Sequence, residues 1–290
     1  MRSFADHNPI AVAVYFLCTA GIAMFCMDPV ILALSLAGAL VCFQLHALPG
    51  SGRSHLYTLA LFLLMALINP LVSHRGATVL FVINHTLITL EATVYGFAAA
   101  GMIVSVLYWF RAFSSIMTSD KLLYLFGGLS PKLALILSMT LRYVPLFGLQ
   151  ARKVSQAQKA LGLYKEDNVV DSLRGGTRIF SVMVTWALEN GIITADSMTA
   201  RGYGVGRRSR FSLFRWRRGD TLLLLLSIIL AGLTLPGVSS RAFAYYPLIT
   251  ASPMNAQAVI SYLAYALLAF LPAIIHGKEA IRWHFLTSDI

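Results

Sequence analysis

Long apolar stretches recur along this chain, and they leave few folds open to it. Hydrophobic residues make up 58% of the 290 residues and charged residues only 12%, against about 25% charged in an ordinary globular domain. The surplus apolar surface has to face lipid, where backbone polar groups need internal partners and only helices or closed barrels can span. The stretches lack the strict alternation of barrel strands. The sequence therefore predicts an all-α membrane protein.

Six apolar segments are candidates for spanning helices, which need about 20 residues each. The third is expected to end at Asn69-Pro70, because proline interrupts a helix. The first follows the N-terminal residues almost at once, which favours a retained signal anchor over a cleaved signal peptide. The segments cover roughly residues 10–27, 30–45, 55–68, 87–110, 221–235 and 259–275.

The middle of the chain has a different character. A helix pattern begins at Ser130-Pro131, turns from apolar to polar after Leu149 and ends at Gly162. A second amphipathic helix is expected over residues 169–203, with a possible break at Gly175-Gly176. Both helices are too charged for simple spans and too apolar for open water, so we expect them at the cytoplasmic membrane surface. This divides the chain into N-terminal transmembrane helices (1–115), the two amphipathic helices (116–206), and a basic segment with the last spans (207–290).

The net charge of +11 is placed unevenly along the chain. Because cytoplasmic loops collect Lys and Arg, we expect both termini in the cytoplasm, with only Arg75 and Arg241 outside. A run of arginines, interleaved with aromatic residues, precedes the fifth span. Such a run can bind nucleic acid, but its place beside a span favours anionic lipid headgroups, worth about 1 kcal/mol per basic residue. The sequence thus predicts membrane anchoring, and no nucleic-acid partner, for Arg207, Arg208, Arg210, Arg215, Arg217 and Arg218.

Sequence motifs for catalysis are missing. The chain contains no Gly-x-x-x-x-Gly-Lys-Ser/Thr phosphate loop, no His-Glu-x-x-His and no Gly-x-Ser-x-Gly. Its three cysteines form no Cys-x-x-Cys pair, which argues against a metal site. Among the acids only Glu91 lies clearly inside a spanning segment, whereas ion-driven transporters usually need several such groups. We therefore expect neither catalysis nor a cofactor in this chain alone.

The second amphipathic helix ends in Ala200-Arg201-Gly202. Small residues let a helix end approach another protein closely, and the Arg201 guanidinium offers a planar set of five donors for carboxylates. Gly202 can adopt a positive φ and end the helix. The alternative is an ordinary basic cap that the helix dipole stabilises. The residues alone leave both interpretations open.

With the basic residues that follow, Ala200-Arg201-Gly202-Tyr203-Gly204 resembles the Ala-Arg-Gly element of the T component of energy-coupling factor (ECF) transporters. Further pieces are similar to that family in order and spacing, and the match covers about residues 69–210. Each piece is weak by itself, and five in order are a strong indication. The further pieces are Asn69-Pro70-Leu71 with His74-Arg75-Gly76, Glu91 with Gly96, Ser119-Asp120, and Leu141-Arg142-Tyr143-Val144-Pro145 leading into Gln156-Ala157-Gln158-Lys159-Ala160.

The resemblance implies a non-catalytic coupling subunit of an ABC importer in the plasma membrane of a prokaryote. Two ABC ATPase subunits, which bind ATP and Mg²⁺, would each receive one coupling helix in a groove. A small membrane protein, the S component, would bind the vitamin or metal ion. Ala200-Arg201-Gly202 would be the second docking motif and Ala160-Leu161-Gly162 the first. Leu161 stands where the family usually has Arg, so this contact is either apolar or takes its charge from Lys159.

Two more charged residues are candidates for roles in this arrangement. Arg142, expected at interfacial depth, would hold the first coupling helix by pairing or snorkelling. Glu91 is either a helix–helix contact or part of the surface that meets the S component. The rival function is a self-contained membrane permease or channel. Few polar residues within the spans and a large surface module stand against it.

Overall fold

The computed structural model describes residues 4–46, 52–73, 76–83, 86–162, 169–206, 214–240, 243–250 and 253–287. The chain forms two compact units. Unit 1 comprises Met1–Leu122 and Phe214–Ile290, and unit 2 comprises Leu123–Leu213. Unit 2 is therefore inserted into the chain of unit 1. The division at 115/116 and 206/207 that the sequence suggests stays a prediction.

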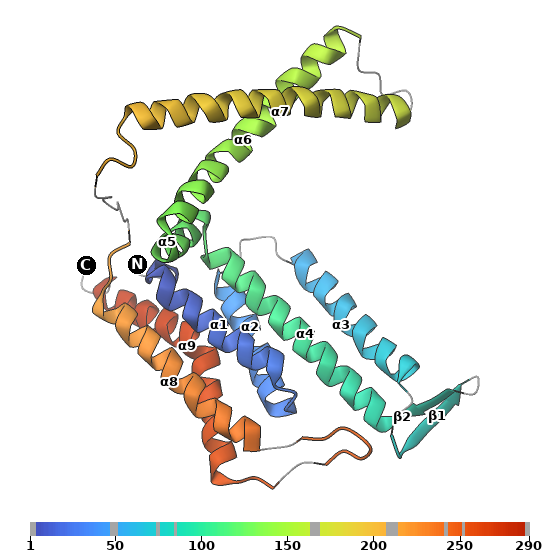
Figure 1. The fold of residues 1–290 in the computed structure, drawn as a ribbon. Coiled ribbons are helices and arrows are strands. Elements are labelled where there is room, and N and C mark those ends of the chain that lie inside the picture. Colours follow the sequence, from blue (N-terminus) through green and yellow to red (C-terminus); the bar gives the residue numbers. More distant parts are fainter. Residues whose placement is uncertain are drawn as a thin grey trace. The chain divides into compact units, whose positions relative to one another are not determined.

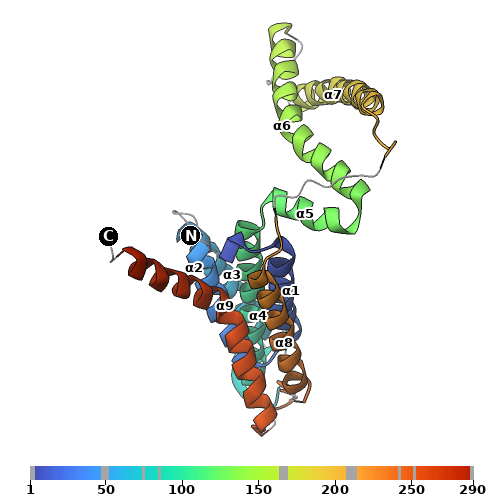
Figure 2. The same cartoon turned by 90° about the vertical axis from the view of Figure 1, so that its left-hand side faces the viewer.

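Unit 1 is a bundle of apolar helices that follows a short 3-10 turn, η1 (Phe4–Asp6). Its helices are α1 (Pro9–Phe25), α2 (Pro29–His46), α3 (Gly52–Val72), α4 (Leu90–Ile116), α8 (Arg218–Ser240) and α9 (Ala256–Thr287). α4 packs on α1, α2 and α3, whereas α8 packs on α1 and α9 (Figures 1 and 2). A further helix, α5 (Ser119–Leu129), begins in unit 1 and continues into unit 2.

Aromatic side chains fill the core between α1 and α4. Tyr15 and Phe16 each meet Trp109 edge-on, with ring centroids 6.1 and 6.0 Å apart, and Phe4 contacts both α1 rings. Such pairs contribute about 0.5–1.5 kcal/mol each beyond the area that they bury. The Trp109 indole donates to the Ser35 hydroxyl at 3.0 Å, so the buried polar atom of the ring has the partner that it needs.

The expected all-α membrane class is confirmed. Within the described ranges, five helices are long and apolar enough to cross a membrane, while α1 and α2 are apolar but shorter. Four of the five are α3, α4, α8 and α9 of unit 1. The fifth is α6 (Pro131–Ala160) of unit 2, which qualifies by length and composition. Its place at the membrane surface, expected from its polar second half, stays a prediction.

A β-hairpin, which the sequence analysis does not predict, precedes α4. β1 (Val79–Ile83) pairs antiparallel with β2 (Thr86–Thr89), so the expected helix start near Leu87 is wrong, and α4 begins at Leu90. The physical reason is local: β-branched residues dominate both strands and favour extended backbone. Thr89 then caps α4, because its hydroxyl accepts from the Ala92 amide at 3.3 Å.

Two expected helix interruptions are absent from the structure. α3 does not stop at Asn69-Pro70 but continues to Val72, because a proline near a helix end removes only one hydrogen bond and the neighbouring helix supports the last turn. α7 (Val169–Ala200) runs unbroken through Gly175-Gly176. Each interior glycine costs a helix about 1 kcal/mol, which packing against a second helix can offset.

Unit 2 is built on the crossing of α6 and α7 (Figure 1). The Tyr143 hydroxyl and the Thr194 hydroxyl lie 2.7 Å apart. Next to them Phe147 meets Trp186 edge-on, with ring centroids 5.3 Å apart. Because the helices cross, their C-terminal ends lie on different sides of the contact (Figures 1 and 2). The C-terminal end of each helix therefore extends away from the crossing, separately from the C-terminal end of the other helix.

Candidate functional site

The C-terminal end of α7 is a Schellman cap formed by the Ala200-Arg201-Gly202 element. Gly202 has a φ of 75°, a left-handed conformation that glycine adopts without penalty. The Gly202 amide donates to the Thr199 carbonyl, and the Tyr203 amide reaches back to the Met198 carbonyl, both at 3.0 Å. These are the two hydrogen bonds that define the motif. The cap leaves the Arg201 side chain exposed at the last position before the chain turns.

The C-terminal end of α6 shares the glycine turn and the first of these two hydrogen bonds. Gly162 has a φ of 71°, and its amide donates to the Lys159 carbonyl at 3.0 Å. Leu161, at the position that Arg201 occupies on α7, is 72% exposed. Ala160-Leu161-Gly162 and Ala200-Arg201-Gly202 thus share a backbone conformation through matching positions. They differ in the central side chain, which is apolar in one and a guanidinium in the other.

Two other pieces of the sequence pattern meet where α3 packs on α4. A Cβ atom on Gly96 would lie 2.8 Å from the Ala66 carbonyl oxygen, 3.2 Å from the Asn69 Cβ and 3.4 Å from the Pro70 Cδ. Only glycine leaves room for this approach. The Asn69-Pro70 element and Gly96, 26 residues apart in the numbering, are therefore one packing contact between two helices.

Glu91 lies in the first turn of α4 and is 1% exposed. Its carboxylate accepts from the Thr78 hydroxyl at 2.7 Å and from the Thr78 amide at 3.2 Å. Gly76, with a φ of 148°, lies so close that a Cβ there would be 2.5 Å from the Glu91 Oε2 atom. Glu91 thus holds the turn that leads into the hairpin. His74 and Arg75, which directly precede Gly76 in the chain, lie outside the described residues.

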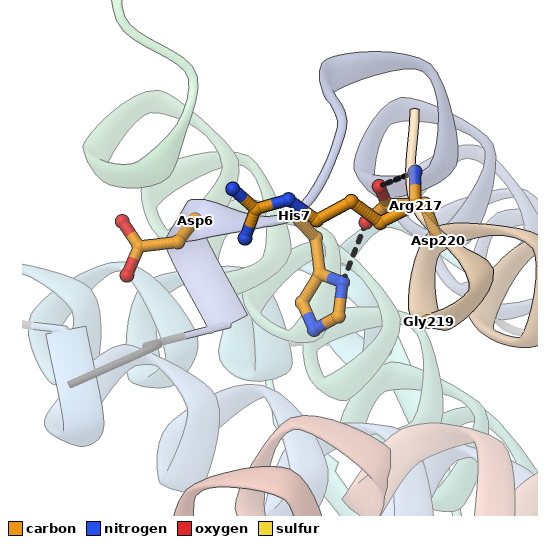
Figure 3. Close-up of a pocket in the computed structure, with 5 residues that line it drawn as sticks. All are labelled: Asp6, His7, Arg217, Gly219 and Asp220. Carbon is orange, nitrogen blue, oxygen red and sulfur yellow. Dashed lines mark hydrogen bonds and ion pairs between the residues drawn. The ribbon is translucent and has the colours of Figure 1, made fainter. Parts of the chain in front are cut away.

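Asp220 joins the start of α8 to the N-terminal segment, at the place where the chain returns from unit 2 (Figure 3). Its Oδ1 atom lies 2.8 Å from the His7 Nδ1 atom and accepts from the Asn8 amide at 3.1 Å. Its Oδ2 atom accepts from the Arg217 amide at 2.9 Å. Asp220, His7 and Arg217 line a small pocket of about 40 Å³, together with Asp6 and Gly219. The sequence reasoning missed this contact, because nothing in the pattern pairs residues so far apart in the chain.

Lys121 makes a second contact with the N-terminal segment, at the start of α5. Its ammonium donates to the Ala5 carbonyl at 2.6 Å and to the Ile116 carbonyl at 2.9 Å. Burial lowers the pKa of Lys121 from its ordinary value, although Asp6 opposes the shift. The N-terminal segment therefore contacts the chain both where it leaves for unit 2 and where it returns.

The predicted basic residues divide between described and undescribed parts of the chain. Arg215, Arg217 and Arg218 are exposed just before or at the start of α8, whereas Arg207, Arg208 and Arg210 lie outside the described residues. Arg142 is exposed on α6. Within the described ranges, no three His, Cys, Asp or Glu side chains come together in a way that could hold a metal ion.

Comparison with known proteins places these features in a family. The model of the CbiQ family, described as cobalt transport protein, matches residues 2–213. The energy-coupling factor transporter transmembrane protein EcfT of Listeria innocua serovar 6a is 36% identical over 104 residues, which are 35% of this chain and 39% of that protein. EcfT of Streptococcus equi subsp. equi is 31% identical over 101 residues, 34% of this chain and 38% of its own length. The chain thus spans about two fifths of the length of these relatives.

Proposed function

This chain belongs to the CbiQ family of cobalt transport proteins, which confirms the resemblance to the T component of ECF transporters, and we propose that it is the transmembrane coupling subunit of an ABC importer. In this role it transmits the ATP-driven motion of two ATPase subunits to a small substrate-binding membrane protein, for the uptake of a vitamin or metal ion. One observation carries the proposal: two long helices cross in a unit of their own, and each ends in an exposed Ala-x-Gly cap.

The proposed role is mechanical. A 30-residue helix such as α6 is about 45 Å long, at about 1.5 Å per residue, and an intact helix carries a displacement from one end to the other. The Tyr143–Thr194 and Phe147–Trp186 contacts couple α6 to α7. ATP and Mg²⁺ belong to the ATPases in this proposal, and the choice of substrate belongs to the S component.

The distribution of charge in unit 1 supports the proposed orientation. α4 and α9 begin at the hairpin end of the bundle, so Arg111 and Lys278, near their C-terminal ends, lie toward the end where α1 and α8 begin (Figure 1). Lys121 and the arginines around Asp220 lie at that same end. Within the described part of unit 1, the opposite end carries the acids Asp28 and Glu91 and no Lys or Arg. We place the basic end in the cytoplasm of a prokaryotic cell.

The test is the replacement of Arg201 in a tagged chain purified in mild detergent from its own cells. The wild-type chain should bring down two ABC ATPase subunits and a small hydrophobic membrane protein. A buried, hydrogen-bonded charge pair that loses one partner costs roughly 2–5 kcal/mol, mostly through faster dissociation. Arg201→Ala should therefore lower the recovery of ATPase strongly, while the chain still inserts normally. Leu161→Ala should do less, because the loss of an apolar contact leaves no charge unpaired.

The variant Arg201→Lys separates docking from helix capping. Lysine keeps the positive charge that the helix C-terminus favours but lacks the planar fork of the guanidinium. Docking predicts partial rescue of ATPase recovery, whereas a simple cap predicts full rescue. If Arg201→Ala retains both ATPases at wild-type levels, the coupling role is wrong. A chain that purifies alone and takes up substrate on an ion gradient would instead be a self-contained permease or channel.

A further inference from the structure

A groove runs along one face of α8, from its first residue to its middle. Its volume is about 490 Å³, and it is lined by Arg218, Thr221, Leu222, Leu225, Leu226 and Ile229. Side chains four residues apart on a helix form continuous ridges along its surface. The six lining residues belong to two neighbouring ridges of this kind, one that starts at Arg218 and one that starts at Thr221. The groove therefore follows the helix between two ridges of side chains.

The groove lies on the side of α8 that faces away from the bundle. Leu223, Ser227 and Leu230, on the other side, are at most 8% exposed, and α8 packs on α1 and α9 there. The four apolar residues of the groove are between 38% and 66% exposed. In a membrane protein such a face meets either the acyl chains of lipids or the apolar helix of a partner.

The length of the groove matches one leaflet of a bilayer. From Arg218 to Ile229 the helix rises by about 16 Å, at about 1.5 Å per residue. One leaflet is half of a hydrocarbon core that is about 30 Å thick. An acyl chain that enters beside Arg218 can therefore lie along the leucines over the whole depth of its own leaflet.

A cation and an indole mark the open end of the groove. Arg218 lines that end, and Arg215 is exposed three residues earlier in the chain. The Trp216 indole, between them in the sequence, donates to the Thr221 hydroxyl at 2.7 Å, which holds the ring beside the first turn of α8. Tryptophan is enriched at the membrane–water interface, and a guanidinium forms paired hydrogen bonds with phosphate. This end thus carries the groups that recognise a phosphate headgroup.

The acid in the first turn of α8 does not oppose an anion at this place. The Asp220 carboxylate is 4% exposed and is engaged by the N-terminal segment and by the Arg217 amide. It lies two positions after Arg218, and residues two apart on a helix point to different sides. The Arg217 side chain also points elsewhere, because it lines the small pocket with Asp6 (Figure 3). Arg218 is therefore the cation that meets the groove.

We propose that this groove binds one anionic phospholipid, with the phosphate on Arg218 and an acyl chain between the two ridges of α8. The site depends on the membrane class of the chain and goes beyond the proposed coupling function. A zwitterionic headgroup is less favourable, because Arg215 and Arg218 repel its ammonium group. An apolar helix of a partner would cover the leucines but would bring no anion to the guanidinium.

The test uses a photo-reactive diazirine on an acyl chain of phosphatidylglycerol, which is anionic, or of phosphatidylcholine, which is zwitterionic. The full chain, with the proteins that purify with it, is placed in phosphatidylcholine nanodiscs that contain a small fraction of either probe. Labelling of residues 222–229 is divided by labelling of Ile260 and Leu263 on α9. Both reference residues are exposed, and residues 242–277 around them contain no Lys or Arg.

The anionic probe should give a higher ratio of α8 to α9 labelling than the zwitterionic probe. The expected difference is about fivefold, the factor for one basic residue at a lipid headgroup. Arg218→Gln should remove this difference. Arg217→Gln is the matched control, because it removes the same charge from a side chain that lines the small pocket instead, and it should keep the difference.

A second pair of variants tests the groove between the ridges. Leu225→Trp places a large ring in the groove and should lower labelling of the remaining groove residues by the anionic probe to the level of the zwitterionic one. Ile228→Trp makes a similar change at a position that is 49% exposed on α8 but is not among the residues that line the groove. It should leave the preference for the anionic probe unchanged.

Three results would overturn the inference. Equal ratios with the two probes in the wild-type chain would mean that the groove holds ordinary bulk lipid. Labelling of α9 without any labelling of residues 222–229 would mean that a protein covers the groove. An equal loss of preference in Arg217→Gln and Arg218→Gln would reduce the effect to general surface charge. Each of these results leaves the coupling function standing, because that function is tested by ATPase recovery.

Discussion

Gly96 shows how one residue decides the packing of a helix pair. α3 contacts the rest of unit 1 mainly through α4 and β2. At Gly96 the backbones of α3 and α4 come closer than any side chain at that position would allow. The atom facing the missing Cβ is the carbonyl oxygen of Ala66, the group that Pro70 leaves without its usual helix donor. The glycine and the proline are thus two parts of one contact.

Gly96→Ala should destabilise unit 1 because its Cβ would lie 2.8 Å from a backbone oxygen that cannot move aside by itself. Overpacking of this kind costs about 1–3 kcal/mol, so the midpoint of thermal unfolding in detergent should fall. Gly101→Ala is the control on the same helix, since a Cβ there meets nothing within 4 Å. It should leave the midpoint unchanged or raise it, as alanine favours helix. Equal losses in both variants would contradict the close-packing explanation.

The N-terminal segment has a connecting role at the scale of elements. Residues from Phe4 to Asn8 contact the start of α5 through Lys121 and the start of α8 through Asp220. These are the two places where the chain of unit 1 leads to unit 2. A short segment ahead of the first apolar helix therefore holds both connections of the proposed coupling unit to the bundle.

Asp220→Ala should loosen this junction. The carboxylate is 4% exposed and accepts from three groups, and buried donors left without a partner cost about 1–3 kcal/mol. The expected result is a lower unfolding midpoint in detergent. Ser227→Ala is the control on α8, because among the described residues its buried hydroxyl bonds only to the Leu223 carbonyl of the same helix. A loss no larger than that of Ser227→Ala would show that the junction contributes little.

At the scale of the whole molecule, the described Lys and Arg residues of unit 1 lie toward one end of the bundle, where acids such as Asp220 also lie. The basic end holds the N-terminal segment and both chain connections to unit 2, and the opposite end holds the hairpin and the loop around Tyr245. The Tyr245 hydroxyl donates to the Met27 carbonyl at 2.6 Å, which ties that loop to the end of α1. The two ends of the bundle therefore differ both in their basic residues and in their chain connections.

An impermeant thiol reagent applied to intact cells tests the orientation. In a cysteine-free background, a cysteine in place of Leu248, in the loop at the hairpin end, should react from outside. A cysteine in place of Lys278, near the C-terminal end of α9, should react only after the cells are opened. Both side chains are exposed, so access through the membrane is the only intended difference. The opposite labelling would reverse the bundle and remove the basis for ATPase docking.

Much of the fold could be predicted from local sequence, and the exceptions have physical causes. Apolar length predicts the helices of unit 1, and the glycine at 202 predicts the end of α7, because both depend on neighbouring residues alone. The sequence analysis fails at the hairpin and at the last turn of α3, the first for a local reason and the second for a tertiary one. In the first, β-branched residues prevail over helix continuity, and in the second, contact with α4 prevails over the effect of Pro70.

The sequence by itself determined the class of this protein and the glycines that end α6 and α7. Lipid forces an apolar chain into helices, and the Ala-x-Gly pattern specifies a cap whatever the rest of the chain does. Only the tertiary structure decided what the isolated polar groups hold. The Glu91 carboxylate bonds to Thr78 ahead of the hairpin, and Asp220 meets His7 across 213 residues of chain. Such partners are set by how helices pack, because the energy of burying a polar group depends on a neighbour that the local pattern does not specify.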